Sequence, residues 1–312
     1  MGKPGNLLVH QGLEMAAPSN GTNIVVLILT YKQKQKTLEC LSSLSKMHEP
    51  RFQVLVWDNG SQDGTLEAVQ GEFPGVLTHS HPVNLGVAEG RNAAAKLAIN
   101  HLGATHLLFL DNDILVEPGF VQSLFNPFNQ DSQLGQTQAK LRFRHDPQRI
   151  NDGGGAQINF VFWRIRPVGY GEIDNGQHDV PRECISCGGA MMVRADVFQQ
   201  LGGFDPQFGP FGPEDLDFSL RLQKAGLRAM YIPQAVGYHQ VSHTYGKGYS
   251  EDYARHKSRH WLLFMHRHAA LSEKIAFYLV GAPYLAVHVA VREGRKGNWK
   301  AVRGLLRGLF KS

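Results

Sequence analysis

The sequence predicts an α/β fold in which a mostly parallel sheet is flanked by helices, followed by a helical C-terminal extension. In the first third of the chain, apolar β-branched runs alternate with segments of helical periodicity, an order that gives right-handed βαβ units. Polar and acidic residues follow directly after several of these runs, at the strand ends where open α/β sheets bind ligands. The chain has 312 residues, 42% of them hydrophobic and 19% charged. This composition excludes disordered, collagenous and coiled-coil proteins.

Four short apolar runs are predicted strands, at 23–29, 52–57, 76–79 and 106–110. The first, NIVVLIL, is typical of a buried parallel strand because it is apolar without alternation. Between these strands we predict helices at 38–44, 65–70 and 86–100. The second half of the chain is less regular. It contains a predicted helix at 214–225 and a short strand at 230–232.

The positive charge is concentrated at the C-terminus. Seven basic residues and one acid lie between 291 and 312, which accounts for more than the whole net charge of +5. The rest of the chain is therefore nearly neutral, and nucleic acid is not a predicted partner. From 299 to 310, apolar residues recur at helical spacing with basic residues on the other side, as in a helix that lies on an anionic membrane. The alternative is a helix packed on the protein with its charges in water.

An apolar run at 275–291 precedes this basic helix. It has 17 residues and contains Pro283 and His288, so it is shorter than the roughly 20 apolar residues that span a bilayer. We expect it to lie in a membrane interface. The chain has three cysteines, an odd number that fits a reducing compartment and predicts a cytoplasmic location.

Two aspartates on one tight turn, Asp111 and Asp113, follow the strand at 106–110. Paired carboxylates of this kind hold a divalent cation such as Mn²⁺ or Mg²⁺ against diphosphate oxygens. Acidic turns are also common loop formers, but no Lys or Arg stands beside this one to neutralise it. His239, after the strand at 230–232, is a candidate third ligand, with His243 as the alternative.

Two further turns carry polar groups. Asp58 ends the second strand, where its carboxylate either forms a strand-to-helix turn or accepts the imide N–H of a uracil or thymine base. Asn84, Gly86 and Arg91 open the helix at 86–100, where they cap the helix or hold an anion at its N-terminus.

Glu214 and Asp215 open the helix at 214–225. Acids are favoured there by the helix dipole, but the preceding Gly- and Pro-rich loop at 208–213 is a rigid turn that could hold both carboxylates at a cleft. The P-loop and Rossmann glycine motifs are both missing after the first strand.

Six segments, in order between residues 23 and 244, resemble family 2 glycosyltransferases, which have the GT-A fold. They are VVLILTYKQ, VWDNGSQDGT, NLGVAEGRNAA, LFLDNDI, CGGAMMVRADVFQQLGGFD and PEDLDFSLRLQKAG. The resemblance implies that Asp111, Asp113 and His239 hold the metal ion, and that Asp215 is the general base with Glu214 as the alternative. The implied nucleotide-sugar site comprises Thr30, Tyr31, Asp58, Asn84, Gly86, Arg91, Asn112 and Gly189.

The resemblance also implies the reaction. We expect an inverting, metal-dependent transfer of one sugar from dTDP-rhamnose or a UDP-sugar to a saccharide or lipid-linked acceptor, as in rhamnosyltransferases that build surface polysaccharides. The motif of processive synthases, Gln-x-x-Arg-Trp, is missing. The alternatives are a non-catalytic sugar- or lipid-binding protein and a sugar-1-phosphate nucleotidyltransferase. The predicted parts are a flexible leader (1–22), a catalytic domain (23–245) with a nucleotide-binding half (23–115) and an acceptor-side half (116–245), and a C-terminal extension (246–312) that contacts the inner face of the cell membrane.

Overall fold

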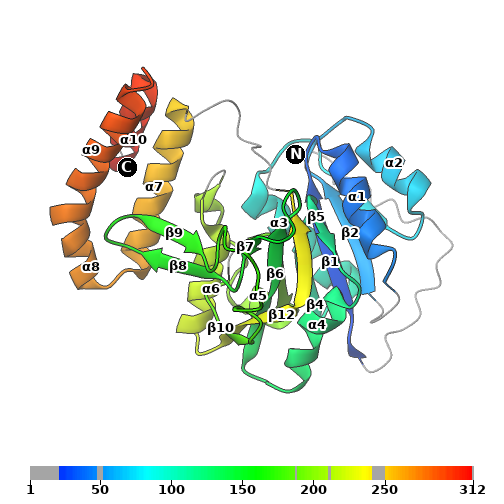
Figure 1. The fold of residues 1–312 in the computed structure, drawn as a ribbon. Helices are drawn as coiled ribbons and strands as arrows, with labels where there is room; N and C mark the ends of the chain where they lie inside the picture. The colour runs from blue at the N-terminus through cyan, green and yellow to red at the C-terminus, as the bar shows by residue number, and fades with distance from the viewer. Residues whose placement is uncertain (1–20, 48–51, 187, 210–211, 241–249, 311–312) are drawn as a thin grey trace.

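The protein is described by a computed structural model that covers residues 21–47, 52–186, 188–209, 212–240 and 250–310. A twisted sheet with helices on both faces forms its main body, and the last helices form a separate bundle beside the hairpin of β8 and β9 (Figure 1). The predicted leader at 1–22 lies outside the described residues except for its last two positions. His243 also lies outside the described residues.

The first half of the chain alternates strands and helices as predicted. Its elements are β1 (Ile24–Thr30), α1 (Lys34–Leu44), β2 (Phe52–Asp58), α2 (Thr65–Glu72), β3 (Leu77–Ser80), α3 (Val87–Leu102), β4 (His106–Asp111), β5 (Ile114–Val116), α4 (Phe120–Phe125) and η2 (Asn126–Asn129). Each predicted strand and helix of this half is present, with ends that differ by a few residues.

The second half adds strands that the sequence did not reveal. Its elements are β6 (Leu134–Phe143), β7 (Ile150–Asp152), β8 (Ala156–Asn159), β9 (Arg164–Pro167), β10 (Arg182–Glu183), β11 (Ala190–Arg194), α5 (Ala195–Gln200), η3 (Pro206–Phe208), α6 (Glu214–Lys224) and β12 (Arg228–His239). The strand predicted at 230–232 is the start of the much longer β12.

Among the described residues the main sheet has the order β10-β12-β6-β11-β4-β1-β2-β3, with β5 paired to β12 and β7 to β6. Strands β4, β1, β2 and β3 are parallel, as expected from their helical crossovers. Strand β11 is antiparallel to both of its neighbours, β4 and β6, so the complete sheet is mixed. The predicted α/β class is confirmed, and the parallel part brings the carboxyl ends of β1, β2 and β4 to one edge.

Alternate side chains of β1 enter two different cores. Val25 and Leu27 pack in the core that contains α3 and α6, whereas Ile24, Val26 and Ile28 pack in the core that contains α1, α2 and α4. All five are at most 3% exposed. A strand covered on both faces needs this continuous apolar run, which is why its sequence shows no alternation.

The C-terminal extension is a helical bundle of α7 (Glu251–His268), α8 (Leu271–Ala276), the π-helical turn η4 (Phe277–Gly281), α9 (Ala282–Gly294) and α10 (Trp299–Phe310). Residues Leu271–Gly294 form 24 continuous helical residues, in the described chain the one helix that is long and apolar enough to cross a membrane by length and composition alone. The helix is thus longer than the 17-residue apolar run, because it continues beyond the run at both ends, so length alone does not exclude a crossing. An interfacial position stays a prediction.

The basic helix α10 packs on α7, as in the alternative stated for it above. Ala301 and Leu305 are at most 1% exposed and form a small core with Ala254 of α7 and Val289 of α9. Gly304 and Gly308 face α7 so closely that a Cβ at Gly304 would lie 2.1 Å from the carbonyl oxygen of Glu251. These glycines weaken an isolated helix, but here they allow the two helices to touch.

We predict that Gly304→Ala destabilises the bundle, although alanine is the better helix former by about 1 kcal/mol. The clash with the Glu251 carbonyl should outweigh that gain, since the neighbouring atom is backbone and cannot rotate away. The matched control is Gly71→Ala in α2, where a Cβ meets nothing within 4 Å, and this variant should gain stability. Urea unfolding of both variants checks the prediction, and equal gains would contradict it.

Candidate active site

The candidate site lies where β1, β2, β4 and β12 end. Strand β4 ends at Asp111. Strand β12 ends at His239, which pairs in antiparallel register with Ile114 of β5, and the Gln240 N–H donates to the Asp113 carbonyl at 2.9 Å. This pairing brings His239 beside the acidic turn, although more than 120 residues separate them in sequence.

Asp111, Asp113 and His239 form a group that could hold a metal ion. One ligand atom from each lies within 4.8 Å of the other two. The His239 Nδ1 lies 2.9 Å from the Asn151 amide oxygen, and Nε2 lies 3.3 Å from Asp113 Oδ1. Because an amide oxygen can only accept, Nδ1 carries a proton and Nε2 is the ring atom turned toward the carboxylates. The donor set therefore fits Mn²⁺ or Mg²⁺ in the arrangement predicted from the sequence.

Burial alone would lower the pKa of His239, but its hydrogen bond to Asp113 and the charges of Asp113 and Asp111 outweigh that effect and raise it. In the absence of a cation, the aspartates therefore favour the positively charged form of the ring.

Gly189 makes room for the first aspartate. A Cβ at this position would lie 2.5 Å from Asp111 Oδ2 and 2.8 Å from the side chain of Ile114. Gly189 directly precedes β11, and its carbonyl accepts from the Asp111 N–H at 2.7 Å. Its role in binding the nucleotide sugar stays a prediction, while its contact with the acidic turn is direct.

The expectation that no cation stands beside the acidic turn is wrong. Arg91 Nη2 lies 2.6 Å from Asp111 Oδ1, and Lys36 Nζ lies 3.4 Å from Asp113 Oδ2. Both cations come from helices that are distant in sequence, so inspection of the neighbouring residues could not find them. The Arg91 side chain is 8% exposed, and burial opposes its charge, but Asp111, Glu214 and Asp215 outweigh this and raise its pKa.

Glu214 and Asp215 lie at the start of α6 on the other side of Arg91. Arg91 Nη1 lies 3.5 Å from Glu214 Oε1, so one guanidinium connects the acidic turn of Asp111 to this pair. Burial and mutual repulsion raise the pKa of Glu214, and burial raises the pKa of Asp215. Asp215 also accepts backbone N–H groups of Gly188 at 2.5 Å and of Leu216 at 2.8 Å, which favour its ionised form. These two N–H groups favour ionised Asp215, and its role as the general base stays a prediction.

The predicted nucleoside-binding residues lie at the ends of β1 and β2. Asp58 is buried and its Oδ1 accepts the Ser61 N–H at 3.0 Å, which is the turn role considered for it above. Tyr31 is 40% exposed and is available to contact a base. The Thr30 hydroxyl lies 2.8 Å from that of Thr37, and the Asn112 amide donates to both hydroxyls. Thr30 and Asn112 thus join the acidic turn to β1 and α1.

Asn84 and Gly86 form the entry to α3. Asn84 Oδ1 accepts the Gly86 N–H at 2.8 Å and the Asn59 amide at 2.9 Å, so Asn84 holds the loop to the end of β2. Gly86 has a φ of 81°, in the left-handed region that glycine adopts without strain. Anion binding by these residues stays a prediction.

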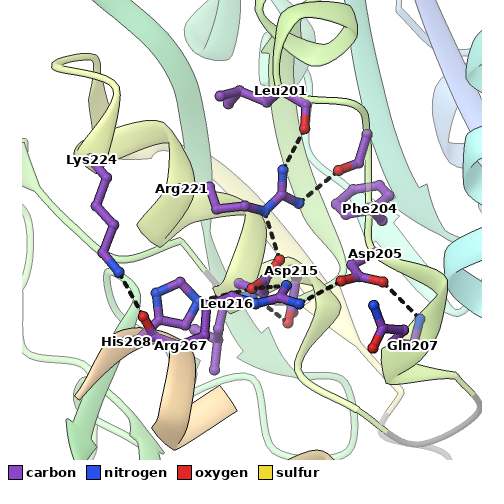
Figure 2. Close-up of polar contacts among 12 residues, drawn as sticks. Leu201, Phe204, Asp205, Gln207, Asp215, Leu216, Arg221, Lys224, Arg267 and His268 are labelled. Atoms are coloured by element: carbon purple, nitrogen blue, oxygen red, sulfur yellow. Dashed lines mark hydrogen bonds and ion pairs between the residues drawn. The ribbon is translucent and has the colours of Figure 1, made fainter. Parts of the chain in front are cut away.

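A buried charge network joins α6 to the end of α7 (Figure 2). Asp217 is fully buried and lies 2.7 Å from Arg221 of its own helix, 2.8 Å from Arg267 and 2.8 Å from His268. Arg267 also lies 2.8 Å from Asp205. Burial would raise the pKa of Asp217, but hydrogen bonds from His268, Arg221 and Arg267 outweigh it and hold that pKa below its usual value. This network fixes the helix that carries Glu214 and Asp215 to the end of α7.

Sequence reasoning missed three parts of this site: the bridging role of Arg91, the orientation of His239 by Asn151, and the Asp217 network. Arg91 stands in the segment NLGVAEGRNAA, so its importance was visible but its partners were not. Asn151 is three residues before Gly154, in a segment with no recognisable pattern of metal ligands.

Comparison with known proteins gives a family match over residues 21–261, to the model described as glycosyltransferase like family 2. The N-acetylglucosaminyl-diphospho-decaprenol L-rhamnosyltransferase of Mycobacterium tuberculosis is 26% identical over 302 residues, which cover 89% of this chain and 97% of the relative. The O-antigen biosynthesis protein RfbC of Myxococcus xanthus is 31% identical over 239 residues, 72% of this chain but 18% of that protein.

Two solved structures are similar in fold. GalNAc-T7 with UDP, GalNAc and Mn²⁺ has a TM-score of 0.63 at 15% identity, over 80% of this chain and 48% of that one. The mannosyltransferase PcManGT of Pyrobaculum calidifontis, in complex with GDP-Man and Mn²⁺, has a TM-score of 0.56 at 17% identity, over 93% of this chain and 87% of that one. At these identities the likeness shows a shared fold alone, which is the GT-A fold expected above.

We predict that Asn151→Ala weakens Mn²⁺ binding about 10- to 100-fold, because the His239 ring loses the partner that fixes its orientation and tautomer. Titration of Mn²⁺ by calorimetry measures the change. Gln148→Ala, an exposed position on the preceding loop, is the control and should bind as the wild type does. Unchanged binding in Asn151→Ala would show that the amide has no part in the site.

We also predict that Asp217→Asn lowers the free energy of unfolding by about 3–5 kcal/mol at pH 7, because it leaves Arg221 and Arg267 without their buried partner. The folded pKa of Asp217 is depressed, so its contribution is present above the unfolded pKa of about 3.9 and is lost as the pH falls through the folded pKa. The difference between variant and wild type should therefore shrink in acid.

The matched control is Asp196→Asn, which breaks the exposed pair with Arg194 and should cost less than about 1 kcal/mol. Urea unfolding at neutral and acidic pH tests both variants. A loss as small for Asp217→Asn as for the control would contradict the prediction.

Proposed function

Because this chain belongs to glycosyltransferase like family 2, and is therefore a glycosyltransferase, we propose that it transfers one L-rhamnose from a dTDP-linked or UDP-linked donor to a saccharide acceptor carried on a lipid diphosphate. Support for this substrate comes from the Mycobacterium tuberculosis relative, whose name states an L-rhamnosyl transfer to a decaprenol-linked sugar and whose length this chain covers almost completely. The nucleotidyltransferase alternative gains nothing from the family match.

The observation that carries the proposal is the bridge made by Arg91. One buried guanidinium contacts Asp111 of the metal-binding turn and Glu214 of the acidic pair, so the two groups that a sugar transfer needs are fixed at one edge of the sheet. A non-catalytic binding protein has no need of a carboxylate such as Asp215, poised by two backbone N–H groups beside a metal-binding group.

In the proposed reaction, Asp215 takes the proton from an acceptor hydroxyl. The resulting oxygen attacks the anomeric carbon as the bond from that carbon to the diphosphate oxygen breaks. Attack comes from the face opposite the leaving diphosphate, so the configuration at the anomeric carbon is inverted. Asp215 needs its ionised form for this step, and the N–H groups of Gly188 and Leu216 stabilise that form.

Asp111, Asp113 and His239 would hold Mn²⁺ or Mg²⁺ in this proposal. A divalent cation supplies positive charge that stabilises the leaving nucleoside diphosphate. Arg91 keeps Asp111 in place and offsets the repulsion among Asp111, Glu214 and Asp215. Asp58, Thr30 and Tyr31 would receive the nucleoside at the ends of β1 and β2, and Asn84 and Gly86 would lie beside the phosphates at the start of α3.

We place this reaction in the cytoplasm at the inner face of the membrane, where a lipid-linked acceptor is confined. Two cysteines of the described chain, Cys40 and Cys184, are free and buried, which fits a reducing compartment.

We predict that Asp215→Asn lowers kcat about 10²- to 10⁴-fold while donor binding persists, since the amide keeps the shape but cannot accept the proton. Glu214→Gln should lower kcat less. Transfer of radiolabelled rhamnose from dTDP-rhamnose to a polyprenyl-diphosphate N-acetylglucosamine measures turnover, and calorimetry with dTDP measures binding.

The reverse ranking of the two variants would make Glu214 the base. Label transfer by the wild type with retained anomeric configuration, determined by NMR of the product, would exclude the single-displacement reaction. Transfer from GDP-linked sugars alone would exclude the assignment of the base pocket to Asp58.

A further inference from the structure

The continuous helix of α8, η4 and α9 exposes an unusually apolar surface. Six aliphatic side chains along it are between 48% and 74% exposed: Leu271, Ile275, Leu279, Val280, Val287 and Val291. We call this set the apolar face. Tyr278 and Tyr284 of the same helix are 50% and 42% exposed. Proteins that work in water rarely expose contiguous apolar surface of this extent without a partner that covers it.

The opposite side of the same helix is fixed in the protein. Phe277 is fully buried in a core with Trp261, Phe264 and Met265 of α7, and Val289 is 3% exposed. Gly281 faces the Val161 carbonyl so closely that a Cβ would lie 1.7 Å from its oxygen. Crossing a bilayer would require all of these contacts to break. The helix is therefore held in the bundle, and the apolar face alone is free to meet a partner.

Cationic side chains adjoin the apolar face. Lys296 is 66% exposed at the side chain, and Arg295 and Lys300 are exposed as well. Arg303 is 65% exposed at the side chain, although it also lies 3.7 Å from Glu251 of α7. Trp299, 63% exposed, stands among these cations, as aromatic residues do at the level of lipid headgroups. In the segment from 271 to 310 the acids are Glu273 and Glu293, and Glu293 is 2% exposed.

This charge pattern selects the partner. In a symmetric dimer through the apolar face, each copy would bring the same cationic rim and no anionic surface to match it, because a two-fold interface places the same patch on both subunits. An anionic bilayer supplies the opposite charge and an apolar interior together, and stable surface anchoring needs those two signals.

We propose that the side chains of the apolar face insert into an anionic membrane surface. In this arrangement α8 and α9 lie in the plane of the membrane interface, and the cations from 295 to 303 contact lipid phosphates. This inference rests on the proposed function only where it explains access to a lipid-linked acceptor. It assigns the apolar contact to α8 and α9 in place of α10, whose buried side packs on α7 and whose first turns supply cations.

Flotation of the full chain with vesicles tests the proposal. We expect binding to vesicles of phosphatidylcholine with phosphatidylglycerol, at least tenfold weaker binding to phosphatidylcholine alone, and release at high salt. The double variant Leu279→Glu/Val287→Glu should lose at least tenfold in binding. Val180→Glu, at an aliphatic side chain that is 71% exposed on the main body, is the matched control and should float as the wild type does.

Three results would overturn the proposal. The first is flotation of the double variant like the wild type, and the second is a wild-type dimer that becomes a monomer in the double variant, with no lipid binding by either protein. The third is that alkaline carbonate fails to extract the protein from cell membranes, which would indicate a spanning helix. Hydrolysis of the donor sugar without vesicles reports on the proposed function separately. Loss of flotation with unchanged hydrolysis therefore concerns the membrane contact alone, whereas no hydrolysis with intact flotation concerns the reaction alone.

Discussion

The candidate site depends on the buried guanidinium of Arg91. Asp111, Glu214 and Asp215 come from two distant parts of the chain, and their negative charges would repel each other in a partly buried space. Arg91 lies among them on α3, a helix of the first half of the chain that also forms the core with Phe218 and Leu222 of α6. Packing of α3 against α6 and the ion pairs of Arg91 therefore support each other, and the geometry of the metal-binding turn depends on both.

The first half of the chain was predictable because its physical signals are local. A strand buried on both faces must be continuously apolar, and the helices between parallel strands must carry apolar residues at helical spacing, so 24–111 could be assigned from sequence almost element by element. Strands β6 to β11 are short, irregular or antiparallel, and their pairing is set by contacts between distant residues. No local pattern indicates that β11 enters between β4 and β6.

The same distinction applies to the site. Asp111, Asp113, Glu214 and Asp215 could be proposed because they stand at strand and helix ends, and the structure brings the metal-binding group of Asp111, Asp113 and His239 together. The neutralising cations Arg91 and Lys36 could not be predicted, since charge balance in a folded protein is set by residues that are near in space. The glycines of α10 show the same limit. Helix propensity treats Gly304 and Gly308 as defects, but they are the positions where the α7 backbone comes closest.

The Asp217 network makes the C-terminal bundle part of the catalytic domain in energetic terms. Arg267 and His268 are the last residues of α7, and they supply two of the three partners of a carboxylate that has no access to water. A shortened chain without α7 would retain every strand of the main sheet, but Asp217 would lose Arg267 and His268 and keep only Arg221 of the three partners. The resulting penalty falls on α6, two residues from Asp215. Domain boundaries drawn at the end of the sheet would thus cut through the support of the site, and a fragment that ends there is expected to be a poor source of active enzyme.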